Sequence, residues 1–485
     1  MNTLVVSVNI EGFDYGIHSL VKAFYPEADV KVLPWAIEES SEENLPDIQI
    51  KFEDSSIYFS ILNDEFDSLK VIYDENCDRS VIKNHLKRLI YTGLSKYTKK
   101  ELPWGTLTGI RPTKIAMTLL DEGSNEEEIR EYMKEVYLLS DEKLELAIDI
   151  AKREKALLDT IHYKDGYSIY IGIPFCPTTC LYCSFTSHPI CSYKKRIGEY
   201  LEAVFKEIDF IADYYKDKIL DTIYVGGGTP TTLEADELEL LLNKITTTLD
   251  LSNLKEFTVE AGRADSITKE KLEVLKKYNV DRISVNPQTM NQKTLDFIGR
   301  RHTVEQVLEA YKLAKKIGIP NINMDIILGL PGEEETEVSY TIEEIKKLDP
   351  DSLTVHSLAI KRASKLAEWI KENGMSALNN TDETMAIARD GAKDMGMVPY
   401  YLYRQKNMSG NFENVGYAKE GKFGIYNILI MEEVQTIVAI GAGSVTKRVF
   451  GDGRIERCDN VKDVALYIEK IDEMIERKRN LLGLG

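Results

Sequence analysis

Three cysteines in one short stretch are the residues of this chain best placed to do chemistry. Cys176, Cys180 and Cys183 form a C-x3-C-x2-C run in YIGIPFCPTTCLYCSF, directly after the apolar segment 167–173. Thiolates are soft ligands, and three of them on a tight loop can hold three irons of a metal–sulfur cluster. Because a cubane cluster has four irons, this spacing leaves one iron free. That iron could bind a small molecule through its amino and carboxylate groups and pass it an electron.

Two other roles compete for the same cysteines. They could be structural zinc ligands with Cys191 or His188 as the fourth, although zinc sites usually pair C-x2-C units. They could also be buried apolar side chains, since free cysteine packs well. A loop rich in Pro and Thr just after a strand is a poor place to bury three thiols by chance. The spacing therefore favours the cluster.

The wider stretch resembles a known family. The pattern C-x3-C-x-aromatic-C, with Tyr182 before the third cysteine, is similar to the signature of the radical S-adenosylmethionine (SAM) superfamily. With the following GGGTPT (226–231), it looks like the oxygen-independent coproporphyrinogen III oxidase (dehydrogenase) family, and most like its HemZ-type branch. The resemblance runs from about Tyr167 to Ala359. It departs from the best-characterised branch at Phe185, where that branch has a fourth cysteine, and in the large N-terminal region.

The resemblance implies a [4Fe–4S] cluster on the three cysteines and SAM at the free iron, without deciding whether a second SAM binds. It leaves catalytic residues of the protein itself unknown. The positions that match SAM contacts of the family are Tyr170, Tyr182, Gly227, Gly228, Thr229, Glu260, Gln288, Arg300, Asp325 and Ala359. In the family, the glycines receive the amino group of SAM, and the acid matched by Glu260 binds the ribose. Gln288 and Arg300 match a family Gln and Arg at the same spacing, and Ala359 matches a backbone contact.

Some of these positions can also be interpreted from their residue type and local sequence, without the resemblance. Glu260 ends an apolar stretch, where a carboxylate could accept both ribose hydroxyls or simply be a solvated acid. Asp325 interrupts the apolar run INMDIILGLPG. Because a buried charge without a partner is costly, Asp325 either pairs with a base or faces a ligand. Consecutive glycines allow a close backbone approach or merely a tight turn. Tyr170 and Tyr182 could be core aromatics.

Composition limits the function classes. The chain has 485 residues, with 61 Lys and Arg against 80 Asp and Glu, so its net charge of −19 opposes broad binding to nucleic acid or anionic membrane. It lacks an apolar run long enough to span a bilayer and a basic region before its first apolar stretch. Six cysteines, three of them clustered, do not make a disulfide framework. We expect a cytoplasmic protein without a membrane span.

The central region alternates strand and helix patterns, which predicts parallel strands with right-handed crossovers. Six such units are too few for a closed eight-fold barrel, so we expect an α/β fold with an open, partial (β/α)6 TIM-like barrel. Its chemistry should lie at the carboxyl ends of the strands. The expected strands are Tyr167–Ile173, Thr222–Val225, Glu256–Glu260, Arg282–Asn286, Asn321–Leu328 and Ser352–His356.

Two regions flank this core, which we place at residues 165–360. Residues 1–160 show strand patterns first and helix patterns second, which predicts a separate α+β domain of unknown role. Its loop Leu102–Lys114 is more typical of a packed turn than of a lid that brings Arg111 to an active site. Residues 361–485 form a mixed α/β extension specific to the family. We expect a helix at Glu383–Met395, a strand at Ile425–Ile430 and a last helix at Val461–Lys478.

The function implied by the resemblance is the oxidative decarboxylation of coproporphyrinogen III, or a related tetrapyrrole, to protoporphyrinogen IX. A radical derived from SAM removes a hydrogen atom from a propionate, CO2 leaves, and a vinyl group remains. The electron would come from a donor such as flavodoxin or ferredoxin. The four propionates of the substrate need cations, for which the candidates are Arg404, Lys406, Lys361 and Arg362, although each by itself is more typical of a solvated surface residue.

Two other functions stay open on the same scaffold. A haem-binding chaperone would need an axial ligand, usually His, but no histidine follows His356 and the His-rich tail of the family's chaperones is absent. A radical SAM enzyme acting on another substrate, including RNA, is the second alternative. The acidic charge and the lack of a basic stripe in residues 1–160 argue against RNA.

Overall fold

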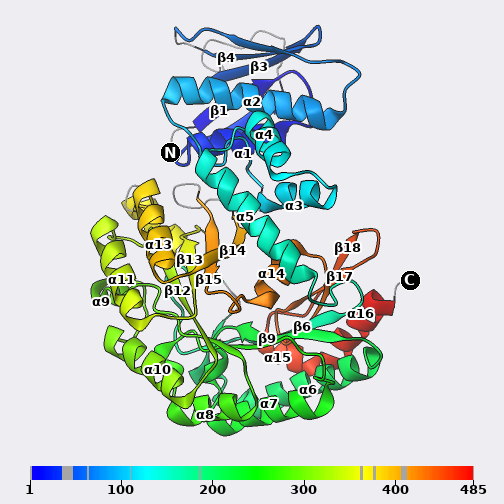
Figure 1. Cartoon of the computed structure of the whole chain (residues 1–485), viewed down its shortest axis with the longest axis vertical. Coiled ribbons are helices and arrows are strands. Elements are labelled where there is room, and N and C mark those ends of the chain that lie inside the picture. The colour runs from blue at the N-terminus through cyan, green and yellow to red at the C-terminus, as the bar shows by residue number, and fades with distance from the viewer. Residues whose placement is uncertain are drawn as a thin grey trace. The chain divides into compact units, whose positions relative to one another are not determined.

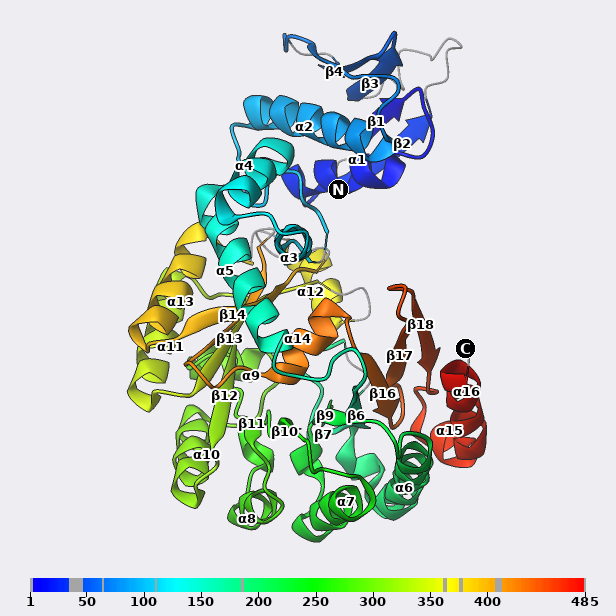
Figure 2. The same cartoon turned by 45° about the vertical axis from the view of Figure 1, so that its right-hand side comes forward.

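The structure is a computed structural model that describes residues 3–34, 47–62, 65–109, 111–184, 187–360, 364–374, 378–405 and 412–483. The chain divides into two compact units. The first comprises Met1–Lys152 with Arg404–Asn407, and the second comprises Arg153–Tyr403 with Met408–Gly485. Figures 1 and 2 show the elements of both from two directions.

The second unit is built on one large sheet, which has eleven strands within the described residues. Six of these follow one another both in the chain and in the sheet, and each pairs in parallel with the next. They are β6 (Tyr167–Ile173), β9 (Leu220–Gly227), β10 (Glu256–Glu260), β11 (Arg282–Ser284), β12 (Asn321–Leu328) and β13 (Ser352–Ser357). The predicted partial (β/α)6 barrel is confirmed.

Amphipathic helices connect these strands and cover the outside of the sheet (Figure 1). They are α6 (Ile197–Tyr214), α7 (Ala235–Thr248), α8 (Lys269–Lys277), α9 (Gln292–Phe297), α10 (Val304–Ile317) and α11 (Glu335–Leu348). Each of the longer helices turns a stripe of apolar side chains inward, as in α10, where Val307, Ala310, Tyr311 and Ala314 are buried. The barrel therefore follows from helix and strand periodicities that are visible in the sequence.

The C-terminal region extends the barrel sheet at both edges. Beyond β13, β15 (Asn414–Ala418) and β14 (Val398–Tyr403) add antiparallel strands. Beyond β6, β16 (Thr436–Ile440) adds a parallel strand, followed by antiparallel β17 (Val445–Val449) and β18 (Ile455–Asp459). Its helices are α12 (Lys365–Asn373), α13 (Asp382–Asp394), α14 (Ile425–Glu432), α15 (Val464–Glu469) and α16 (Ile471–Gly483).

Two predictions for this region were wrong. The apolar segment Ile425–Ile430, expected as a strand, begins helix α14. The Glu256 carboxylate accepts hydrogen bonds from the first amides of α14, Ile425 N at 2.7 Å and Tyr426 N at 3.2 Å, and so satisfies donors that a helix leaves free. The expected last helix is two helices, α15 and α16, and the first is capped by Asp463.

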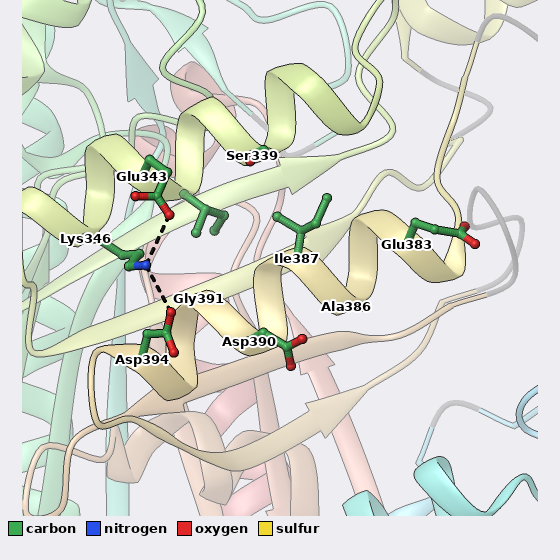
Figure 3. A pocket seen from close by; sticks show the side chains of 10 residues that line it. Ser339, Glu343, Lys346, Glu383, Ala386, Ile387, Asp390, Gly391 and Asp394 are labelled. Atoms are coloured by element: carbon green, nitrogen blue, oxygen red, sulfur yellow. Dashed lines mark hydrogen bonds and ion pairs between the residues drawn. The ribbon is translucent and has the colours of Figure 1, made fainter.

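A groove of about 420 Å³ lies between α11 and α13, and Figure 3 shows the side chains that line it. The two helices approach closely because Gly391 has no side chain, and a Cβ atom there would overlap Ile342. Lys346 bridges them, with its Nζ 3.1 Å from Glu343 Oε1 and 3.0 Å from Asp394 Oδ2. The groove is lined only by these two helices. It is a feature of helix packing and includes no strand end of the barrel.

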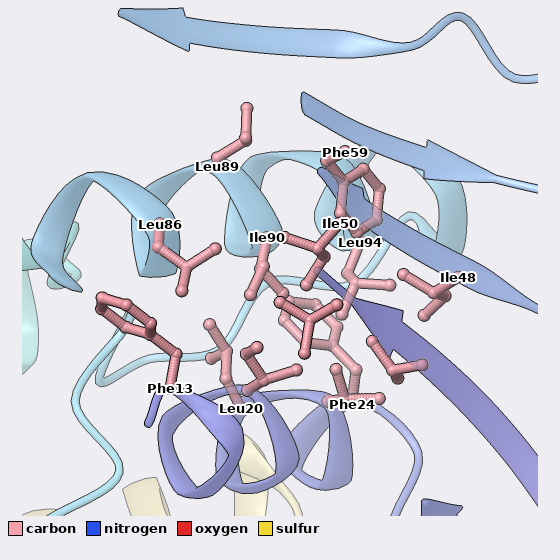
Figure 4. Close-up of a cluster of buried hydrophobic side chains, with 14 of the residues drawn as sticks. Phe13, Leu20, Phe24, Ile48, Ile50, Phe59, Leu86, Leu89, Ile90 and Leu94 are labelled. Carbon is pink, nitrogen blue, oxygen red and sulfur yellow. The ribbon is translucent and has the colours of Figure 1, made fainter. Parts of the chain in front are cut away.

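The first unit contains a mixed sheet in the order β2-β1-β3-β4-β5, counted over the described residues. The strands are β1 (Thr3–Val8), β2 (Asp29–Pro34), β3 (Ile48–Glu53), β4 (Ser56–Ile61) and β5 (Leu69–Ile72). Its helices are α1 (Asp14–Phe24), α2 (Arg79–Thr98), α3 (Thr113–Asp121), α4 (Glu126–Tyr137) and α5 (Asp141–Leu158), the last of which continues into the second unit. Figure 4 shows the core between the sheet, α1 and α2, where Leu20, Phe24, Ile50, Phe59 and Leu94 meet.

The order of elements in this unit corrects a prediction. Helix α1 and strand β2 were not expected, so strands and helices are not separated along the chain. Strands β1 and β2 are parallel, which requires the crossover that α1 provides. The signal was present, because Ile17, Leu20, Val21 and Phe24 are buried at helical spacing.

The loop that begins at Leu102 is a packed turn. Trp104 is completely buried, and Thr106 N donates to Tyr137 O at 2.8 Å. The Arg404 guanidinium lies 5.8 Å from the centre of the Trp104 ring and donates to Leu107 O at 2.6 Å. Arg404 is 4% exposed, which corrects the surface position favoured for it. The other proposed cations, Lys361, Arg362 and Lys406, and also Phe185, lie outside the described residues. No helix in the described part of the chain is long and apolar enough to cross a membrane.

Candidate active site

The cysteine loop follows β6 and is fixed by backbone contacts. Cys176 ends the short strand β7 (Phe175–Cys176), which pairs with β8 (His188–Pro189). Cys180 is buried, and Cys176 and Cys183 are half-buried. Further along, Thr178 Oγ1 donates to Gly299 O at 3.1 Å and Leu181 N donates to Ile298 O at 2.9 Å. The loop is therefore held against the segment that follows α9.

The glycine segment at the end of β9 packs directly on the start of this loop. Gly228 N donates to Ile173 O at 2.8 Å, and Thr229 N donates to Phe175 O at 2.7 Å. Gly227 has a φ of +111°, and a Cβ atom on Gly228 would overlap the Phe175 backbone. Thr229 Oγ1 lies 3.5 Å from Cys176 Sγ. The glycines thus bring two backbones together immediately before the first cysteine.

Glu260 ends β10 and lies among tyrosines. The Tyr224 hydroxyl donates to Glu260 Oε1 at 2.5 Å. The Tyr224 ring stacks on Tyr170 from β6, at 6.1 Å between ring centres, and on Tyr426 from α14, at 4.4 Å. Burial raises the pKa of Glu260 to about 7; the Tyr224 hydroxyl opposes this rise and the nearby Asp325 adds to it. A carboxyl group in this environment can change its charge near neutral pH.

Asp325 on β12 is paired with a base, His356. Its Oδ2 lies 3.7 Å from His356 Nε2 on β13, and its Oδ1 accepts from Asn323 Nδ2 at 2.6 Å. Burial alone would raise the pKa of Asp325, but His356, Asn323 and Thr354 together hold it below its usual value. The side chain is still 20% exposed, so pairing with a base does not prevent it from meeting a ligand. Ala359, half-buried, follows the end of β13.

Gln288 and Arg300 join the strand ends to the cysteine loop. Gln288 has a φ of +67°, rare for a residue with a side chain, and its N donates to Asp325 O at 2.9 Å. Arg300 Nη2 donates to Gly262 O at 2.6 Å and to Asn286 O at 2.8 Å, and Nη1 donates to Tyr182 OH at 2.9 Å. Arg300 therefore ties the ends of β10 and β11 to the residue before Cys183.

Two residues at these strand ends were missed in the sequence. Arg263, three residues after Glu260, reaches the cysteine loop, with its Nη1 3.7 Å from Cys180 Sγ. Asn286 follows β11, and its Oδ1 is buried without a hydrogen-bond partner among the described residues. The available signal was their position, since Arg263 lies just beyond one predicted strand and Asn286 is the last residue of another. Gln288 Oε1 is also buried and unpartnered within the same ranges. Polar atoms of this kind fit a polar ligand.

The donor set fits an iron–sulfur cluster. Three thiols gather on one loop, and Cys176 and Cys180 each have a polar neighbour that can hydrogen-bond to sulfur, Thr229 and Arg263. Within the described ranges, no three His, Cys, Asp or Glu side chains converge on a single metal ion. The thiols of a cubane each bind a different iron. Of the residues considered as a fourth zinc ligand, Cys191 is exposed and the His188 ring packs on Tyr193.

Comparison with known proteins agrees with this chemistry. Residues 170–345 match the radical SAM superfamily. Over 402 residues, the chain is 44% identical to the oxygen-independent coproporphyrinogen-III oxidase-like protein HemZ of Bacillus subtilis, which covers 82% of this chain and 80% of that protein. The chain belongs to the HemZ family of radical SAM proteins. Its cofactors are a [4Fe–4S] cluster and SAM.

Two further relatives are more distant. The heme chaperone HemW of Bacillus subtilis is 37% identical over 195 residues, which are 40% of this chain and 51% of that protein. The solved structure of coproporphyrinogen III oxidase (HemN) from Escherichia coli superposes with a TM-score of 0.52 at 19% identity, over 66% of this chain and 73% of that one. That likeness shows a shared fold. The roles expected for individual SAM contacts remain predictions.

Proposed function

We propose that this chain is a radical SAM oxidoreductase that converts propionate side chains of coproporphyrinogen III, or of a related tetrapyrrole, to vinyl groups without oxygen. For each propionate, a hydrogen atom leaves the β-carbon, CO2 is lost, and the remaining electron passes to an external acceptor. One observation carries the proposal: three thiols and several buried, unpartnered polar atoms gather at the carboxyl ends of consecutive parallel strands. The name of the HemZ relative supports the substrate class.

We assign the following roles to residues that match the family's motifs. Cys176, Cys180 and Cys183 would hold the cluster. The SAM contacts would be Tyr170, Tyr182, Gly227, Gly228, Thr229, Glu260, Gln288, Arg300, Asp325 and Ala359. Glu260, oriented by the Tyr224 hydroxyl, would accept the ribose hydroxyls. The unpaired Gln288 Oε1 would accept a further hydrogen bond from the bound SAM.

When bound, the cluster and SAM supply one electron and the radical that takes a hydrogen atom from the substrate. The protein positions the reacting groups and excludes water. The stacked rings of Tyr170, Tyr224 and Tyr426 form an apolar wall beside Glu260. Arg300 and Gln288 hold the strand-end loops in one geometry, since each makes backbone hydrogen bonds to another strand end. The chain thus supplies a preorganised, largely dry site.

An electron donor and three regions of the chain can be proposed on the same basis. The electron would come from a reduced one-electron carrier such as flavodoxin or ferredoxin, in the reducing cytoplasm. Nucleic acid would not be a partner, because the net charge is −19. Residues 165–360 would form the catalytic core, residues 361–485 a family-specific region, and residues 1–160 a separate module of unknown role.

A haem-binding chaperone is the second candidate, favoured by the similarity to HemW over 40% of this chain. Such a protein needs an axial ligand for haem iron, usually His. All six histidines of the chain lie at or before His356, so the C-terminal 357–485 offers none. The decarboxylase therefore remains the preferred function.

The test uses anaerobically reconstituted full-length protein with dithionite and SAM, with and without coproporphyrinogen III. We expect 5′-deoxyadenosine to form and the tetrapyrrole to lose two CO2 in succession. Cys180→Ser should abolish cluster binding and both products, whereas Cys191→Ser, at an exposed cysteine outside the run, should retain them. Cleavage of SAM without decarboxylation would reject the substrate. No cleavage, by protein with full iron content, would favour the chaperone.

A further inference from the structure

We propose that Arg263 is a positioning residue for the cluster: its buried guanidinium fixes the cysteine loop and sets the reduction potential of the iron–sulfur centre. Nothing in the family resemblance assigned a role to this residue. The inference rests on the proposed role of Cys180 as a ligand. It concerns the electron that enters the site, and so goes beyond the identity of the substrate.

One nitrogen of the Arg263 guanidinium, Nη1, contacts the loop between the first two cysteines. Its Nη1 lies 3.7 Å from Cys180 Sγ, 3.1 Å from Thr178 Oγ1 and 3.4 Å from Thr178 O. The residue is 3% exposed. A single buried cation therefore contacts both a proposed ligand sulfur and the residue midway between Cys176 and Cys180.

The guanidinium is held in this orientation from its other side. Arg263 Nε donates to Asp265 Oδ1 at 2.9 Å and Nη2 donates to Asp265 Oδ2 at 2.7 Å, a two-pronged pairing that fixes the plane of the group. Asp265 Oδ1 in turn lies 3.8 Å from Nδ1 of His302, whose side chain is completely buried. Asp265 thus acts on the cluster through Arg263, and His302 acts through Asp265.

A fixed cation beside a ligand sulfur has a defined electrostatic effect. Reduction adds one negative charge to the cluster while a one-electron carrier is oxidised. A nearby positive charge in a poorly solvated site favours the more negative form, and hydrogen bonds to the sulfurs act in the same direction. Arg263 should therefore raise the midpoint potential and make the cluster easier to reduce. Thr229, near Cys176, is neutral and should contribute less.

The experiment compares Arg263→Gln with Arg301→Gln in the full-length, reconstituted protein without SAM. Arg301 is exposed and lies beside Arg300, so its replacement removes the same charge from a solvated position. Iron content and the midpoint potential, followed by EPR, are the readouts. We expect a more negative midpoint in Arg263→Gln, partial recovery in Arg263→Lys, and no shift in Arg301→Gln. An unchanged midpoint in Arg263→Gln with full iron content would overturn the proposal.

A second variant covers the case in which Arg263→Gln fails to retain iron. Arg263→Lys keeps the positive charge but loses the two-pronged pairing with Asp265 and the contact of Nη1 with Cys180 Sγ, and we expect a smaller shift in the same negative direction. An unchanged potential in this variant would then overturn the proposal. Failure of the ligand assignment is separate, because it would appear as a normal iron content and cluster spectrum in Cys180→Ser.

Discussion

Glu260 is a half-buried carboxyl group at the end of β10, beside the proposed SAM site. Its nearest polar contact is the Tyr224 hydroxyl, which favours the charged form. Gly226 leaves the space beside it open, because a Cβ atom there would lie 3.2 Å from Glu260 Oε2. One carboxylate oxygen is thus held by tyrosine. The other borders the glycine segment, where a ligand's hydroxyl groups could reach it.

SAM affinity should therefore depend on pH. Burial raises the pKa of Glu260 to about 7, so the carboxylate that accepts ribose hydroxyls predominates above that pH and the neutral acid below it. We expect the Kd for SAM to be lowest above pH 7 and to rise up to about tenfold per pH unit below it. Tyr224→Phe, which removes a donor to the charged form, should move this midpoint upward. Calorimetric SAM binding across the range would test this, and a flat profile would contradict it.

The strand-end residues show what the sequence could and could not reveal. Glu260 was found because a carboxylate ends an apolar strand, and Asp325 because it interrupts an apolar run. Gln288 was found through the family resemblance. Arg263 was missed although it lies three residues from Glu260, because its role depends on Cys180, a residue 83 positions away. The role of His356 as the partner of Asp325 likewise depends on the pairing of β12 with β13, which the sequence does not show. Contacts between distant segments carry no local signal.

The glycine segment is in direct backbone contact with the start of the cysteine loop, so a change in one should displace the other. Gly228 has no room for a side chain, since a Cβ atom would overlap the Phe175 backbone just before Cys176. We expect Gly228→Ala to separate the two segments, at a cost of about 1–3 kcal/mol, and to lower iron retention severely. Gly198→Ala is the matched control, because Gly198 lies in helix α6 with nothing within 4 Å of the added Cβ. That variant should be neutral or slightly stabilising.

Iron content after reconstitution, with thermal unfolding of the same samples, separates these outcomes. Normal iron content in Gly228→Ala would show that the close approach is dispensable for the cluster. Equal iron loss in Gly198→Ala would show that the effect is a general result of substitution in the barrel.

Helix α14 shows why a short apolar segment is ambiguous. Ile425–Ile430 is as apolar as a buried strand, and its length fits either structure. The helical structure is stabilised by Glu256, 169 residues earlier in the chain. Its carboxylate accepts hydrogen bonds from the first backbone amides of the helix. Helix α14 then places Tyr426 against Tyr224. The C-terminal region therefore contributes a side chain to the wall beside Glu260, which the sequence did not suggest.

Each of the two units has the elements of an independent core. In the first, α1 and α2 pack on the sheet through a cluster that includes Leu20, Phe24, Ile50, Phe59 and Leu94. In the second, the C-terminal strands and helices are tied to the barrel, for example by the buried ion pair between Lys478 and Glu207 of α6. A chain with two such cores is expected to unfold in more than one step. The cofactor residues proposed here belong only to the second unit.

The division into two units predicts the effect of a destabilising substitution in the core of the first unit. Leu94 is completely buried, so Leu94→Ala should cost about 2–5 kcal/mol and lower the unfolding temperature of that unit. SAM, added to reconstituted protein, should raise only the other transition, because a ligand stabilises the unit that binds it. Scanning calorimetry of the full chain, with Leu240→Ala on an exposed position of α7 as control, measures both. A single transition that shifts as a whole in Leu94→Ala, together with weakened SAM binding, would mean that the N-terminal unit is part of the catalytic machinery.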